Sequence, residues 1–157
     1  MGPAFLDALT VLTAGLFLGP SMDEADLRAT LESMSIERRT AYNQAYPDPP
    51  EVPIYSYAGF TGPLSDGRPD CDAGENEAPR RGDFVEPALL VLYGLLGGRQ
   101  IPNDGVVPVS ACIWGRFLGC IAADHWDQVG QAAGLSDQFN FRAFYRQHAR
   151  FLSESGH

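Results

Sequence analysis

The hydrophobic pattern of the N-terminal third predicts two helices. Apolar residues between positions 4 and 18 recur at a spacing compatible with a helix, and Gly19-Pro20 end that stretch. Ser21-Met22-Asp23-Glu24 then forms a capping box, in which a serine hydroxyl and a glutamate satisfy free backbone N–H groups. The second helix is expected to run to about Tyr42 and to stop before the prolines of residues 47–50, which cannot continue a helix.

The pattern then changes from helical to extended. Residues 52–59 are rich in β-branched and aromatic side chains and predict a buried strand. Residues 62–82 are dominated by Gly, Pro, Asp, Glu and Asn, which is typical of an acidic surface loop.

The C-terminal half contains two predicted helices and two less regular apolar segments. A mostly buried helix is expected from Pro87 to about Leu96, and an amphipathic helix from about Asp137 to Leu152. Between them, residues 106–109 predict a short extended segment, whereas residues 114–121 are apolar but ambiguous. The chain has no internal repeat and no coiled-coil heptads.

Composition narrows the class of protein. A chain of 157 residues with 45% hydrophobic content fits one globular domain. Its net charge of −9 argues against nucleic acid or an anionic membrane surface as a partner. The apolar stretch of residues 8–18 is too short to be a transmembrane segment. Cysteines 71, 112 and 120 permit one disulfide, and Cys71 could pair with either of the other two.

The candidate chemistry is an acid followed by a histidine, Asp104 and then His125, in the order that completes a serine-hydrolase triad. Asp104 would fix the imidazole tautomer, and His125 would take the proton from a serine hydroxyl. Asp124 and Asp127 compete for the orienting role, but neighbours so close in sequence rarely reach the ring nitrogen. The alternative is that Asn103-Asp104-Gly105 is only a turn.

The serine that this pair would serve is not evident. None of the nine serines lies in the G-x-S-x-G elbow that carries the nucleophile of α/β-hydrolases. The sequence therefore predicts the C-terminal part of a hydrolase, which has the acid and the histidine but lacks the nucleophile. Such a chain is expected to be inactive alone. Two alternatives stay open, namely a non-enzymatic remnant or calcium-binding structural module, and one half of a split hydrolase.

Several motifs carry a resemblance to a known family. Residues 103–107 and 124–131, supported by residues 29–35, 41–47 and 55–59, resemble the acid and histidine region of bacterial triacylglycerol lipases of the Pseudomonas and Burkholderia type. The resemblance covers most of residues 24–135. It implies the C-terminal part of an α/β-hydrolase fold, in which an incomplete sheet of few strands has flanking helices.

The resemblance also implies how the chain is organised and what it acts on. Residues 1–157 would be a single partial lipase-like domain, with residues 1–46 as a lid-like helical region and residues 62–82 as an acidic Gly/Pro-rich loop. Asp104 and His125 would be triad members. The substrate would be an acyl ester or lipid, once a nucleophile-bearing segment complements the chain.

The resemblance further implies a structural calcium ion near the histidine. Its ligands would be the Asp127 carboxylate and the backbone carbonyls of Gln131 and Leu135, with Glu86 or Asp83 as the second carboxylate. The alternative is that Asp127 only stabilises the dipole of a helix that starts there. The family disulfide is not reproduced, because Ser110 stands about where a cysteine is expected.

The resemblance implies an extracellular protein. However, residues 1–7 lack a basic region and carry Asp7 where a signal peptide should be apolar. Export by a signal of this chain is therefore not expected, and the other expectation is a cytoplasmic location.

Overall fold

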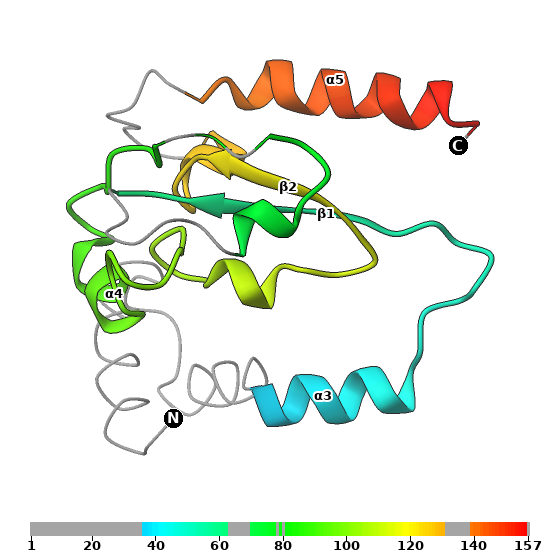
Figure 1. The fold of residues 1–157 in the computed structure, drawn as a ribbon, viewed down its shortest axis with the longest axis horizontal. Helices are drawn as coiled ribbons and strands as arrows, with labels where there is room; N and C mark the ends of the chain where they lie inside the picture. Colours follow the sequence, from blue (N-terminus) through cyan, green and yellow to red (C-terminus); the bar gives the residue numbers. More distant parts are fainter. Residues whose placement is uncertain (1–35, 63–69, 78, 80, 131–138, 157) are drawn as a thin grey trace, which may run out of the picture. The chain divides into compact units, whose positions relative to one another are not determined.

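The computed structural model describes residues 36–62, 70–77, 79, 81–130 and 139–156 (Figure 1). The chain divides between Val52 and Pro53 into two units. In the first unit, helix α3 spans Ile36–Ala45 and ends just before the predicted proline stop. The apolar segment of residues 4–18 and the capping box lie outside the described residues. Their assignment to a lid-like region, and that of all 157 residues to one partial domain, stays a prediction.

The second unit is built on a parallel pair of strands, β1 (Tyr55–Phe60) and β2 (Arg116–Ala122) (Figure 1). The register runs from Tyr55 opposite Arg116 to Phe60 opposite Ala122, with one irregularity after Ser56. The strand predicted at residues 52–59 is confirmed from Tyr55 onward, and the ambiguous segment at 114–121 is a strand from Arg116 onward. The helices and the small parallel sheet are compatible with the α/β class.

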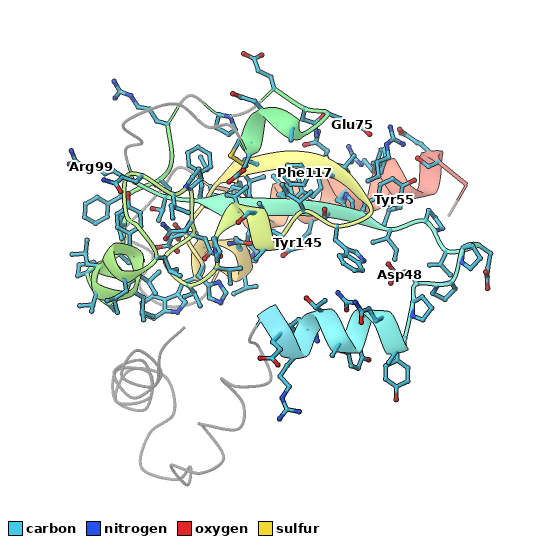
Figure 2. All side chains as sticks on the ribbon, turned by 60° about the horizontal axis from the view of Figure 1, so that its bottom comes forward. Asp48, Tyr55, Glu75, Arg99, Phe117 and Tyr145 are labelled. Carbon is cyan, nitrogen blue, oxygen red and sulfur yellow. A yellow bond between two sulfur atoms is a disulfide. The ribbon has the colours of Figure 1, made fainter. Side chains whose placement is uncertain are left out.

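The larger core cluster lies around the two strands. Figure 2 shows the side chains, with Tyr55 on β1 and Phe117 on β2. The buried members of this cluster are Ala58, Phe60, Cys71, Val109, Phe117 and Cys120. A Cys71–Cys120 disulfide joins the 3₁₀-helical turn η2 (Cys71–Ala73) to β2, which decides between the two pairings that the sequence left open. Cys112 is a free thiol packed against the cluster.

A second core cluster forms around helix α4 (Leu90–Leu95), which begins after the turn at Pro87. Its buried side chains are Val85, Leu89 and Tyr93, and Val106 and Trp126 pack against them. α4 is shorter than the predicted helix of residues 87–96, because residues 87–89 form a turn instead.

The prediction of an extended segment at residues 106–109 is wrong. The chain makes a single antiparallel bridge, Asn103 to Pro108, and then the 3₁₀-helical turn η3 (Val109–Ala111). The Asp104 side chain accepts hydrogen bonds from the backbone N–H groups of Val106 and Val107, so these groups are not available to a strand ladder.

Helix α5 spans Phe141–Glu154, close to the predicted amphipathic helix. Asn140 caps its start by accepting a hydrogen bond from the Ala143 N–H at 3.0 Å. Phe144 and Phe151 make edge-on ring contacts with Tyr57 and Tyr55 of β1, at centroid distances of 4.9 and 5.1 Å. None of the described helices has both the length and the apolar character that a membrane crossing requires.

Candidate functional site

The two predicted triad residues lie beyond the carboxyl ends of β1 and β2. β1 ends at Phe60, and the next residue, Thr61, donates its N–H to the Asn103 carbonyl at 2.9 Å. His125 follows the end of β2, and its N–H donates to the Asp104 carbonyl at 2.8 Å. These backbone bonds bring the Asn103-Asp104-Gly105 loop to the edge of the sheet where sites of open α/β proteins usually form.

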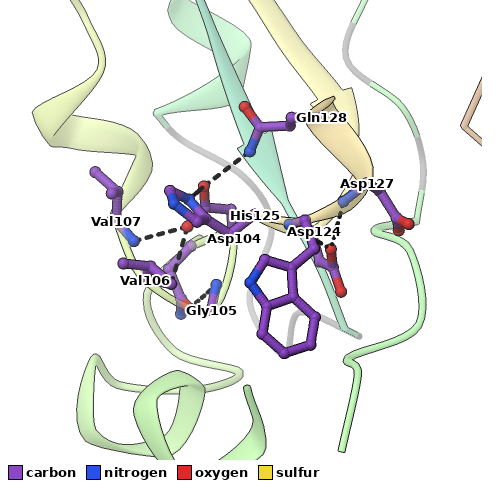
Figure 3. A network of polar contacts seen from close by, with 10 residues as sticks. Asp104, Gly105, Val106, Val107, Asp124, His125, Asp127 and Gln128 are labelled. Carbon is purple, nitrogen blue, oxygen red and sulfur yellow. Dashed lines mark hydrogen bonds and ion pairs between the residues drawn. The ribbon is translucent and has the colours of Figure 1, made fainter. Parts of the chain in front are cut away.

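The side chains of Asp104 and His125 meet directly (Figure 3). Asp104 Oδ2 and His125 Nδ1 are 2.8 Å apart. The Asp104 side chain is only 5% exposed, whereas 41% of the His125 side chain is exposed. The hydrogen bond that His125 makes to the Asp104 carboxylate raises the pKa of His125, although burial acts in the opposite direction. A proton on Nδ1 leaves Nε2 as the nitrogen that can accept a proton from another group.

The Asp104 carboxylate accepts four hydrogen bonds. Oδ1 receives the N–H groups of Val106 at 2.9 Å and Val107 at 2.7 Å. Oδ2 receives His125 Nδ1 and the Gln128 amide, each at 2.8 Å. Hydrogen bonds to an ionised acceptor are among the stronger ones in proteins, so the orientation of this carboxylate is well defined.

The turn formed by Asn103-Asp104-Gly105 is also the segment that positions Asp104. Gly105 has a positive φ of 93°, a region that glycine adopts at no steric cost. Asn103 is fully buried, and its side chain accepts the Gly105 N–H at 2.9 Å. The Asn-Asp-Gly motif is therefore a turn, as the alternative interpretation held, and that turn directs Asp104 at the histidine.

The two acids that flank His125 do not reach its Nδ1. Asp124 Oδ1 accepts the backbone N–H groups of Trp126 and Asp127, each at 2.9 Å. These bonds stabilise the start of the 3₁₀-helical turn η4 (Asp127–Val129). The structure thus brings together Asp104 and His125, the pair that the sequence argument preferred.

Four buried carboxylates form a cluster next to this pair. They are Asp83, Glu86, Asp124 and Asp127. The pKa of Asp127 is raised to about 7, and the largest cause is burial. A side-chain hydrogen bond with Asp83 and the charges of Asp124, Asp83 and Glu86 raise this pKa further. Burial also raises the pKa of Asp124. Asp127 Oδ2 receives no hydrogen bond from an N–H group of the described residues.

This carboxylate cluster contains two of the four residues predicted to bind calcium. Asp127 and Glu86 lie in it, whereas Gln131 and Leu135 lie outside the described residues. Asp83 hydrogen bonds directly with Asp127, but Glu86 acts on Asp127 only through its charge. Among the described residues, no three His, Cys, Asp or Glu side chains are already arranged to hold a metal. Asp127 Oδ2, which receives no N–H group of the described residues, is nevertheless the kind of atom that calcium binds.

Gln128 is a site residue that the sequence does not single out, and it donates a hydrogen bond to Asp104 although 24 positions separate them. No sequence signal marks it, because the contact exists only once the two loops meet at the sheet edge. The other missed residue is Asp83 as the direct partner of Asp127, which the sequence offered only as an alternative to Glu86.

Comparison with known proteins adds no assignment. No family model, curated protein or solved structure matches this chain. The function of the chain is therefore inferred from the geometry at the carboxyl ends of β1 and β2 and from the sequence resemblance.

Proposed function

We propose that this chain supplies the acid and base of a lipase-like carboxylic ester hydrolase. The observation that carries the proposal is the 2.8 Å contact between Asp104 Oδ2 and His125 Nδ1. In this role His125 Nε2 takes the proton from a serine hydroxyl, and Asp104 stabilises the imidazolium that forms. The exposure of the His125 side chain and the burial of Asp104 suit this division, since only the base needs access to the reacting groups.

The nucleophile is the missing part of this proposal. The sequence contains no G-x-S-x-G elbow, and the oxyanion donors of such enzymes lie close to that serine. A serine segment outside these residues would have to complement the chain. An acyl ester or triacylglycerol substrate, an α/β-hydrolase fold and an extracellular location follow from the resemblance and belong to the same proposal.

The first test is the tautomer of His125, observed by NMR of ¹⁵N-labelled protein. We expect the neutral ring to carry its proton on Nδ1, with a strongly deshielded resonance that Asp104→Asn removes. Asp48→Asn, which changes an exposed aspartate, is the matched control. His125→Ala assigns the signal against the other two histidines. A neutral ring protonated on Nε2, or a signal indifferent to Asp104→Asn, would overturn the proposed acid–base pair.

The second test is hydrolysis of p-nitrophenyl butyrate by the purified chain. No turnover that depends on His125 is expected, because removing an acid or base matters only when a nucleophile and oxyanion donors are present. Turnover that is lost in His125→Ala would show that the chain contains its own nucleophile. The proposal that a separate serine segment is needed would then be wrong.

A second candidate function, a calcium-binding structural module, is favoured by the buried carboxylate cluster. Asp127 would bind the ion together with Asp83 or Glu86, and with the carbonyls of Gln131 and Leu135 as the resemblance implies. A calcium ion would neutralise the clustered charge. Because Asp127 is two residues from His125, such a site would fix the loop that carries the base.

Calorimetry with Ca²⁺ tests this candidate, with Mg²⁺ as the control because it demands a smaller octahedral site and keeps its waters. We expect calcium to bind and to raise the melting temperature of the wild-type chain, and both effects to be lost in Asp127→Asn. Asp48→Asn should behave as wild type. Equal responses of Asp127→Asn and wild type would exclude the cluster as the binding site.

A further inference from the structure

One side-chain amide binds the same carboxylate oxygen as the histidine. Gln128 Nε2 donates to Asp104 Oδ2 at 2.8 Å, and His125 Nδ1 lies 2.8 Å from that oxygen (Figure 3). The other oxygen, Oδ1, is bound by two backbone N–H groups of its own turn. Gln128 and His125 thus bind the same oxygen of Asp104 through their side chains.

The position of Gln128 is determined by β1 and by η4. A Cβ atom added at Gly59 of β1 would overlap the Gln128 amide, so the absence of a side chain at Gly59 leaves the space that the amide occupies. The Gln128 backbone N–H also donates to the Asp124 carbonyl at 3.3 Å, at the start of η4. The space at Gly59 thus admits the amide, the backbone bond fixes the residue that carries it, and Gln128 is half-buried.

An amide suits this position chemically. Its N–H group binds the carboxylate, but the amide does not ionise and does not compete for the histidine proton. A carboxylate at position 128 would place a second negative charge beside Asp104. A cationic side chain would neutralise the charge that stabilises the imidazolium. A neutral donor orients Asp104 and leaves its charge unchanged.

We infer that Gln128 is a positioning residue, which holds Asp104 Oδ2 in the orientation that binds Nδ1 of His125. This inference rests on the proposed function, since the orientation matters only if His125 acts as a base. Removing the amide donor should deprive Oδ2 of one hydrogen bond, and the bond between Asp104 and His125 should become weaker.

The experiment compares Gln128→Met with wild type in the full chain by NMR. Methionine keeps the unbranched shape and fills the same space without an N–H donor. We expect the Nδ1 proton of His125 to exchange with water about tenfold faster in Gln128→Met, as the loss of a hydrogen bond to a charged group predicts. Gln147→Met makes the same substitution on the exposed face of α5 and should leave the exchange unchanged.

The outcomes separate this inference from the proposed function. A protected Nδ1 proton in wild type that is equally protected in Gln128→Met overturns the positioning role and leaves the Asp104–His125 pair intact. No protected proton in wild type overturns the pair and, with it, this inference. Faster exchange in Gln128→Met but not in Gln147→Met supports both.

A second variant covers the case in which Gln128→Met does not fold. Gln128→Glu keeps the size and shape of the side chain and replaces the donor by an ionisable acceptor. In its ionised form, we expect at least the same loss of protection. Unchanged protection in a folded Gln128→Glu protein, judged by a dispersed amide spectrum, would overturn the inference.

Discussion

Two buried carboxylates of the second unit, Asp104 and Asp127, lie in opposite surroundings. Asp104 accepts four hydrogen bonds from N–H groups, which compensate the burial of its charge. Asp127 is buried to a similar extent but faces Asp83 and the charges of Asp124 and Glu86, and its pKa rises to about 7. The comparison shows that the groups around a buried acid determine its behaviour more than its depth does.

The largest expected effect comes from removing Asp104, the buried carboxylate that accepts four hydrogen bonds. Asp104→Ala leaves several partly buried N–H groups without this acceptor and should lower the free energy of unfolding by about 3 kcal/mol. Urea denaturation followed by circular dichroism measures this change. Asp48→Ala, on an exposed residue, should change the free energy by less than about 0.5 kcal/mol. Similar losses in the two variants would contradict the contrast between Asp104 and ordinary surface acids.

An intermediate effect is expected from Asp127, the buried carboxylate that lies among other acids. The pKa of Asp127 rises from 3.8 to about 7 in the folded chain, so the protonated form is favoured there. Its contribution to stability is fully present below pH 3.8 and is lost as the pH rises to about 7. Denaturation without calcium should show this loss in wild type, and Asp127→Asn should have a flatter profile. A wild-type profile that rises more steeply than that of the variant would contradict the prediction.

The smallest effect belongs to His125, because 41% of its side chain is exposed. The Asp104 hydrogen bond raises the pKa of His125 above 6.5, so its contribution to stability is present below pH 6.5 and is lost above the folded pKa. The difference in unfolding free energy between wild type and His125→Ala should therefore shrink as the pH rises through the folded pKa. A difference that grows over that range would mean that Asp104 does not stabilise the charged imidazole.

Local patterns predict the regular elements and the meeting of acid and base. The β-branched and aromatic content of residues 52–59 indicates β1, and helical spacing indicates α5. The order of Asp104 and His125 indicates their meeting, because a distant loop acid reaches a ring nitrogen more readily than an immediate neighbour does. These features depend on short stretches of sequence or on the edge of a parallel sheet, where loops converge.

The features that the sequence did not predict depend on side chains that bind the backbone or on contacts between distant parts of the chain. Residues 106–109 have the composition of a strand, but Asp104 binds the N–H groups that a strand would need. The partner of Cys71 depends on where β2 lies, and the contact of Gln128 with Asp104 depends on the space at Gly59. None of these is encoded in the spacing of one segment.

The Cys71–Cys120 disulfide closes residues 71–120 into a covalent ring, with residues 1–70 before it and a tail of residues 121–157 after it. The ring carries Asp83, Glu86 and Asp104, whereas His125 and Asp127 lie only a few residues beyond its closure. Both the acid–base pair and the carboxylate cluster are therefore formed between the ring and the first residues of the tail. The bridge spans 49 positions, and closing a ring of that size disfavours the unfolded chain by about 4 kcal/mol. The disulfide also gives Asp83 and Glu86 a shorter covalent path to Asp127 than the backbone between them does.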